Sequence, residues 1–100
     1  PLRSLLTVLG IFIGTASVIS HHCLLGDHSF LAVGCLLAGN VKVGPRSFLG
    51  ARATVRDHVA IGEASVIGTG VTVLRNTAPS SVLVAPEPVL LPVDSASVRL

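Results

Sequence analysis

Aromatic and charged side chains are scarce in this chain of 100 residues, and their scarcity excludes several classes of protein. Tryptophan and tyrosine are absent, phenylalanine occurs three times, and charged residues make up 12% of the chain with a net charge of +2. A nucleic-acid-binding surface needs a dense basic stripe or aromatic stacking platforms. We therefore expect no nucleic-acid partner.

Long hydrophobic runs are also missing, although half of the residues are hydrophobic. A membrane-spanning helix needs about 20 consecutive apolar residues, and the longest runs here fall short of that. The apolar run 5–13 invites a signal-peptide interpretation, but it continues into the pattern described below without a recognisable cleavage site. We expect a strand or capping coil there and no membrane partner. Because the chain starts at Pro1 without methionine, we expect residues to precede it.

Cysteine is limited to Cys23 and Cys35. Both fall at a position that we expect to point inward, on different sides of the fold. Buried free thiols that act as small hydrophobic side chains are favoured over a disulfide or a metal pair. This favours a reducing, cytoplasmic location.

Aliphatic residues recur at every sixth position from Ile13 to Val73 without a slip. The next residue is usually glycine, alanine or serine, and the residue four positions on is always small or β-branched. The aliphatic positions are Ile13, Ile19, Leu25, Leu31, Leu37, Val43, Leu49, Val55, Ile61, Ile67 and Val73. Such a fixed period is typical of a hexapeptide solenoid.

The period predicts an all-β parallel solenoid of about 3.7 coils, since six residues form one flat side and a corner and three sides close a coil of about 18 residues. Each coil hydrogen-bonds to the next about 4.8 Å away. Glycine tolerates the positive φ that corners can require. We predict a capping segment over residues 1–12, the repeat over 13–78, and a closing strand with an extended proline-rich tail over 79–100.

The outward positions of the predicted sides are unusually apolar, and Phe30, Leu36 and Phe48 are examples. Exposed apolar patches of this extent usually mark an interface. We therefore expect self-association, and a closed symmetric ring would bury such faces.

Histidine is the residue type most suited to chemistry, and His21 and His22 stand together in the stretch 18–27, VISHHCLLGD. This stretch resembles the catalytic segment of sugar O- and N-acetyltransferases of the left-handed β-helix superfamily. It is most similar to sialic-acid O-acetyltransferases and bacillosamine-pathway N-acetyltransferases. The resemblance continues through residues 38–44, 47–50 and 66–74, and implies a left-handed parallel β-helix that forms a homotrimer.

The resemblance implies that His21 is the general base of acetyl transfer from acetyl-CoA to an amine or hydroxyl of a sugar-like or small acceptor. A histidine suits this role because its pKa lies near neutrality. The acidic residue that follows the base in the family is His22 here, which supplies no negative charge, so a weaker base is expected. The second family histidine is replaced by Phe30, which can line the pantetheine channel.

In the family, acetyl-CoA lies between adjacent subunits and contacts mainly backbone groups, which correspond to Ala51 and Thr69. Four basic residues are expected to cluster on successive coils, as candidates for CoA phosphate contacts or for a solvated rim: Lys42, Arg46, Arg52 and Arg56. No metal is implied. The relatives carry an N-terminal acceptor-binding domain of Rossmann type that is not present in these residues, so the acceptor stays unnamed.

Three other classes of solenoid are alternatives for this pattern. A γ-class carbonic anhydrase needs histidines five residues apart, and His22 and His58 are two predicted coils apart, about 9.6 Å, too far for one zinc ion. An ice-binding solenoid would show outward threonine ladders, which are missing here. A non-catalytic trimeric solenoid or degenerate acyltransferase remains the alternative, because His22 and Phe30 depart from the family pattern.

Overall fold

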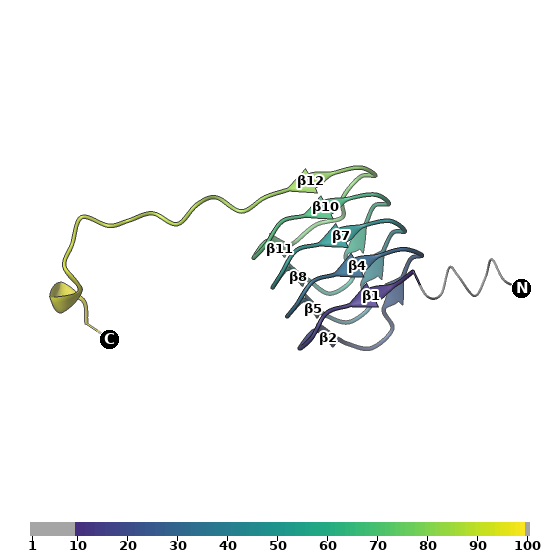
Figure 1. The fold of residues 1–100 in the computed structure, drawn as a ribbon, viewed down its shortest axis with the longest axis horizontal. Coiled ribbons are helices and arrows are strands. Elements are labelled where there is room, and N and C mark those ends of the chain that lie inside the picture. Colours follow the sequence, from purple (N-terminus) through teal and green to yellow (C-terminus); the bar gives the residue numbers. More distant parts are fainter. Residues whose placement is uncertain (1–9, 100) are drawn as a thin grey trace, which may run out of the picture.

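The computed structural model describes residues 10–99, and most of the predicted capping segment, residues 1–12, lies outside that range. The described chain winds into a parallel β-solenoid of about four turns, built from two-residue strands and without an α-helix in residues 10–99 (Figure 1). This confirms the predicted fold class and is consistent with a left-handed β-helix. None of the helical structure in the described range is long and apolar enough to cross a membrane.

The strands stack in three parallel sheets that form the three sides of the coil. Sheet A contains β1 (Phe12–Ile13), β4 (Phe30–Leu31), β7 (Phe48–Leu49), β10 (Val66–Ile67) and β12 (Val82–Leu83). Sheet B contains β2 (Val18–Ile19), β5 (Leu36–Leu37), β8 (Thr54–Val55) and β11 (Thr72–Val73). Sheet C contains β3 (Leu24–Leu25), β6 (Lys42–Val43) and β9 (Ala60–Ile61).

The register explains why the six-residue period must be strict. Each aliphatic residue pairs with the one a full coil later, as Leu31 does with Leu49 and Leu37 with Val55. These side chains point inward and are fully buried. A slip of one residue would turn this whole column outward, because strand side chains alternate between the two faces.

The small position of each repeat also points inward, as predicted. Cys35, Ser47 and Ser65 are buried there, and Ser47 Oγ donates to Gly62 O at 3.1 Å. Cys35 is a free thiol that donates to Gly50 O at 3.2 Å, and Cys23 is free and half-buried. A buried hydroxyl or thiol is therefore bonded to the neighbouring coil, which avoids the cost of an unpaired polar group.

The expected role of the repeat glycines was wrong in one respect. Positive φ occurs three residues after the aliphatic position, mostly at non-glycine residues such as His22, Asn40 and His58. Glycines that follow the aliphatic residue are required for a different reason. A Cβ on Gly44 would lie 2.5 Å from the backbone nitrogen of Glu63 in the next coil. Close stacking of successive coils, rather than φ, excludes a side chain there.

The last coil is shorter than the others. Val73 and Leu83 are ten residues apart, whereas the equivalent Val55 and Ile67 are twelve apart. Thr77 compensates by entering the side position next to β9, where its N–H donates to Ala60 O at 3.0 Å and its Oγ1 accepts from Gly62 N at 2.9 Å. The two missing residues come from the corner between sheets B and C, so this corner is not fully covered by the last coil.

After β12 the chain leaves the solenoid as an extended arm, in which Ser95–Ser97 form one turn of 3₁₀ helix capped by Asp94 (Figure 1). Its side chains from Val84 to Arg99 are exposed. Pro86, Pro88 and Pro92 in this arm cannot donate to a β-ladder.

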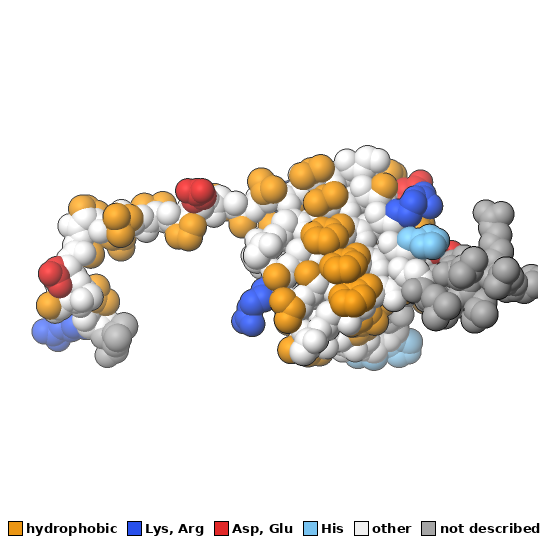
Figure 2. Space-filling view, viewed as in Figure 1, with side chains coloured by type: hydrophobic (Ala, Val, Ile, Leu, Met, Phe, Trp, Pro, Cys, Tyr) orange, Lys and Arg blue, Asp and Glu red, His pale blue; other side chains and the backbone are white. Residues whose placement is uncertain are grey.

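One outer face of the solenoid is wholly apolar. The outward residues of sheet A form a single column in register, Phe12, Phe30, Phe48, Val66 and Val82. Figure 2 shows the upright column of hydrophobic side chains on this face. The three phenylalanine rings are stacked, with centroids 4.6 and 5.2 Å apart. This face has the character of an interface rather than of an ordinary protein surface.

Candidate active site at the histidine corner

Two predicted site residues lie at the corner between sheets B and C. Three successive coils contribute a pair of residues each, and we call this set the histidine corner: His21 and His22, Gly39 and Asn40, Asp57 and His58. Backbone hydrogen bonds hold the pairs above one another, from Asn40 N to His21 O at 2.9 Å and from His58 N to Gly39 O at 3.0 Å. The fixed spacing of the coils, about 4.8 Å, therefore determines the heights of these side chains.

His21 is exposed, and its ring has a defined position. Its Nδ1 lies 2.9 Å from His22 Nδ1, and the two rings meet edge to face. The ring also leans against Gly39, where an added Cβ would lie 2.5 Å from His21 Cε1 and 2.6 Å from Nε2. When His21 donates its Nδ1–H to His22, its Nε2 carries a lone pair and can accept a proton.

A second pair at this corner was missed by the sequence analysis. His58 Nδ1 lies 2.9 Å from Asp57 Oδ2, and the pKa of the Asp57 carboxyl is lowered by this hydrogen bond and by the charge of His58. Asp57 is therefore an anion at neutral pH. Within residues 10–99 this is the only histidine bonded to a carboxylate. The signal was available, because Asp57 and His58 stand at the same two positions of the repeat as His21 and His22.

A hollow of about 410 Å³ opens beside the second pair. It is lined by Asn40, Lys42, His58, Val59, Ala60 and Asn76. It lies where the shortened last coil leaves the histidine corner uncovered. Asn40 lines this hollow, and its N–H also donates to His21 O in the coil below, so one residue separates His21 from the hollow.

The three residues predicted to contact acetyl-CoA lie elsewhere on the coil. Ala51 and Thr69 stack on adjacent coils at the corner between sheets A and B, joined by a hydrogen bond from Gly70 N to Ala51 O at 2.9 Å. Phe30 lies on the outer face of sheet A, between Phe12 and Phe48. Sheet B separates all three from His21, so one chain does not bring them together with the predicted base.

The expected grouping of four basic residues on successive coils was wrong. Lys42 lies on the outer face of sheet C, Arg46 near the corner with sheet A, Arg52 at the corner of sheets A and B, and Arg56 at the start of the histidine corner. They are distributed around a single coil. Arg46 is also paired with Glu63. Of the four, Lys42 alone lines a hollow beside the histidines.

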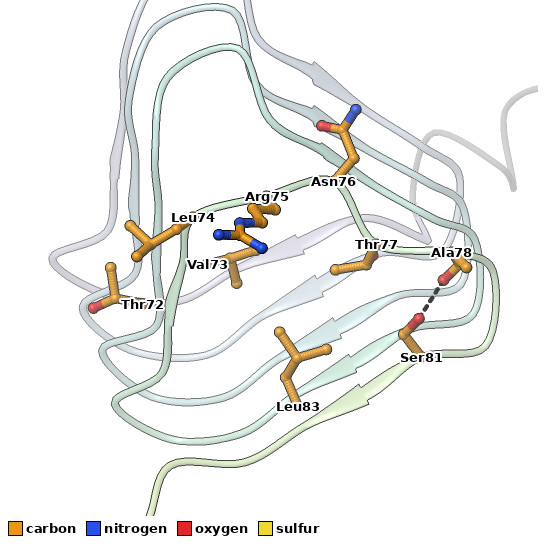
Figure 3. A pocket seen from close by; sticks show the side chains of 9 residues that line it. All are labelled: Thr72, Val73, Leu74, Arg75, Asn76, Thr77, Ala78, Ser81 and Leu83. Atoms are coloured by element: carbon orange, nitrogen blue, oxygen red, sulfur yellow. Dashed lines mark hydrogen bonds between the residues drawn. The ribbon is translucent and has the colours of Figure 1, made fainter.

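A larger hollow, of about 460 Å³, lies at the open end of the stack (Figure 3). Val73, Thr77 and Leu83 lie around it, and Arg75 is the one titratable residue that lines it. This hollow is the uncovered interior of the last coil and presents no acid–base pair. In residues 10–99, no three histidine, cysteine or acidic side chains are grouped so that they could hold a metal ion.

Comparison with known families agrees with this geometry. Residues 40–75 match the family described as bacterial transferase hexapeptide (six repeats). No curated protein matches the chain. The family match and the parallel β-solenoid together support a relationship to the left-handed β-helix superfamily. The match to a transferase hexapeptide repeat suggests a superfamily of the acyltransferase type.

Proposed function

We propose that this protein is an acetyl-CoA-dependent acetyltransferase whose general base is His21. The observation that carries the proposal is the placement of His21 on a hexapeptide coil, exposed, with Nδ1 bonded to His22 and its ring against Gly39. Nε2 is then the nitrogen that can accept a proton from a substrate. The relatives that the segment 18–27 resembles, sialic-acid O-acetyltransferases and bacillosamine-pathway N-acetyltransferases, support an acceptor that is sugar-like or another small molecule.

In the proposed reaction, His21 Nε2 removes a proton from the acceptor amine or hydroxyl as that group attacks the thioester carbonyl carbon. The bond from carbon to sulfur breaks, and coenzyme A leaves as its thiol after taking the proton from the imidazolium. His22 holds the His21 ring by a hydrogen bond but adds no negative charge, so the stabilisation of the imidazolium is weaker than a carboxylate would give. Catalysis is therefore expected to be slow.

The proposal includes a homotrimer, because a single chain leaves the site incomplete. The base and the residues proposed to contact acetyl-CoA lie at different corners and faces of the solenoid: Phe30, Ala51 and Thr69. A neighbouring copy, packed through the apolar outer face of sheet A, would bring its sheet A–sheet B corner towards the histidine corner of the first. Acetyl-CoA would then lie between subunits, with Phe30 along its pantetheine chain and the backbone at Ala51 and Thr69 as hydrogen-bonding partners.

The experiment is a calorimetric titration of the size-verified protein with acetyl-CoA, followed by an acceptor screen with the His21→Ala variant. We expect saturable binding at one site per chain, and a variant that binds acetyl-CoA but transfers no acetyl group. His28→Asn is the matched control, since His28 is an exposed histidine at another corner with a positive φ that asparagine tolerates. Full activity of His21→Ala would remove His21 from the mechanism.

A non-catalytic trimeric scaffold is the second candidate. It is favoured by the absence of any carboxylate bonded to His21 within the described residues, whereas His58 has one. A stable trimer that gives no heat with acetyl-CoA at millimolar concentration would support the scaffold and overturn the proposed acetyltransferase.

A further inference from the structure

Two side-chain donors that line the hollow beside His58, those of Lys42 and Asn76, make no hydrogen bond within residues 10–99. The backbone N–H groups of the hollow are largely engaged: those of Asn40, Lys42, His58 and Val59 donate to carbonyl oxygens, and that of Ala60 donates to Asn76 Oδ1. Any polar group that the hollow offers to a ligand therefore comes mainly from side chains.

Asn76 has a defined amide orientation. Because its Oδ1 accepts from Ala60 N at 2.9 Å, its Nδ2 is directed away from that bond, and it has no hydrogen-bond partner within residues 10–99. Lys42 likewise makes no ion pair in the described part of the chain, where the two ion pairs are Arg46–Glu63 and Asp57–His58. Each of these groups donates hydrogen bonds and neither nitrogen accepts them.

His58 adds a third group with a fixed orientation. Its Nδ1 is held by the Asp57 carboxylate, so Nε2 is the nitrogen available to the hollow. The Asp57 carboxylate is hydrogen-bonded to His58 Nδ1, and no acidic residue lines the hollow. The ammonium of Lys42 is therefore the charged group that lines the hollow.

We propose that this hollow binds a phosphate or carboxylate group, held by the ammonium of Lys42 and the side-chain amide of Asn76, with the His58 ring beside them. An ammonium and an amide N–H that line the same hollow can both donate hydrogen bonds to such a group, and the bond from the ammonium is charge-assisted. Val59 and Ala60 form an apolar floor that suits the carbon skeleton to which the anion is attached. The proposal does not depend on acetyl transfer, because it concerns binding at residues other than His21.

The position of the hollow allows two sources for the bound anion, the acceptor and coenzyme A. Asn40, which lines the hollow, is bonded to the backbone of His21, and His58 lies two coils from the His21–His22 pair, a distance of about 9.6 Å. The anion is either the acidic group of an acceptor whose amine or hydroxyl reaches His21, or a phosphate of coenzyme A. Both sources have the same chemistry at the hollow.

The test is a titration of the full chain with inorganic phosphate at constant ionic strength, in which NMR detects the binding. We expect saturable shifts confined to the signals of residues around Asn40, Lys42, His58 and Asn76. Lys42→Gln removes the charge, and Asn76→Asp keeps the oxygen that accepts from Ala60 N while replacing the donor with an anionic oxygen. Each variant is expected to weaken phosphate binding by about tenfold or more. Arg99→Gln, the same loss of charge on the extended arm, serves as the control.

The outcomes separate the possibilities. Shifts spread evenly over the other basic residues, or an affinity unchanged in both Lys42→Gln and Asn76→Asp, would overturn the site. If the site binds phosphate, adding coenzyme A identifies the source of the anion. Displacement of phosphate assigns the hollow to a coenzyme A phosphate, and simultaneous binding assigns it to the acceptor. If Asn76→Asp does not fold, Lys42→Gln decides alone, because Lys42 is exposed on β6.

Discussion

At the histidine corner, the position of the His21 ring depends on the absence of a side chain at the neighbouring glycine. His21 has room for its ring only because Gly39 has no side chain. Asp57, in the same column one coil further on, carries a carboxylate that is turned towards His58 instead. The same corner therefore presents two pairs, His21 with His22 and Asp57 with His58, and only the second includes a carboxylate.

Gly39→Ala tests the position of the His21 ring. The new Cβ would lie 2.5 Å from His21 Cε1, so the ring must swing away. We expect acetyl transfer to fall about tenfold or more, since small misplacements of a catalytic group have large effects on rate. Binding of acetyl-CoA should persist. Kinetics and calorimetry on the same sample measure both, and transfer at the normal rate would show that the ring position does not matter.

Cys35 gives a residue-level prediction about pH. Burial raises the pKa of the Cys35 thiol above its ordinary value, so the folded protein keeps it protonated. The stability that this contributes is fully present below the unfolded pKa of about 8.5, and is lost as pH rises through the folded pKa. We expect thermal unfolding measured by circular dichroism to shift to lower temperature above about pH 8.5.

Cys35→Ser is the matched variant, because serine keeps a donor for Gly50 O and does not ionise in this range. Its melting temperature should change less between pH 8 and pH 10 than that of the parent. Mass spectrometry of the alkylated protein adds a second readout. Cys23, which is half-buried, should react before Cys35, and equal rates would argue against the raised pKa.

At the scale of the coil, the two kinds of glycine make different predictions. Gly44→Ala places a Cβ 2.5 Å from the backbone of the next coil, whereas at Gly70 an added Cβ meets nothing within 4 Å. Gly70 has a φ of 71°, which Ala16 and Ala64 tolerate at equivalent corners. We expect Gly44→Ala to lower the free energy of unfolding by about 3 kcal/mol, and Gly70→Ala by about 1 kcal/mol.

Denaturant unfolding of the two variants measures the difference. Equal losses would mean that φ, rather than the approach of neighbouring coils, determines where glycine is needed. The comparison is clean because both substitutions add one methyl group to the solenoid.

At the scale of the whole molecule, the apolar outer face of sheet A is the surface proposed to be buried between subunits. Phe12, Phe30 and Phe48 stack on the outside of sheet A, and Phe48 is 42% exposed. If the proposed trimer packs through this face, Phe48→Asp places a charge in a buried interface and shifts the protein towards a monomer. Sedimentation velocity measures the change.

Leu90→Asp is the control for this prediction. Leu90 lies on the extended arm and is 95% exposed, so its replacement should leave the assembly unchanged. A monomeric parent protein, or a Phe48→Asp variant that sediments like the parent, would contradict the proposed interface.

Much of the fold could be predicted because each coil repeats the same local solution. The inward position of Leu31, Leu37 and Cys35 follows from the period alone. The function of the repeat glycines did not follow, since a one-dimensional pattern does not distinguish a positive φ from a close approach between coils. The shortened last coil was also missed, because Thr77 keeps the small character of the repeat while it occupies another position.

The sequence by itself determined the solenoid and its core, since both depend on periods of two and six residues along the chain. The tertiary structure alone decided which side chains meet at a corner and where the stack stays open. It directed the Asp57 carboxylate onto His58, set the His21 ring against Gly39, and left a hollow where the last coil is shortened. The physical reason is that a corner's neighbours are fixed by the stacking of coils and by the two residues missing from the last one, and both are properties of the closed three-dimensional path of the chain.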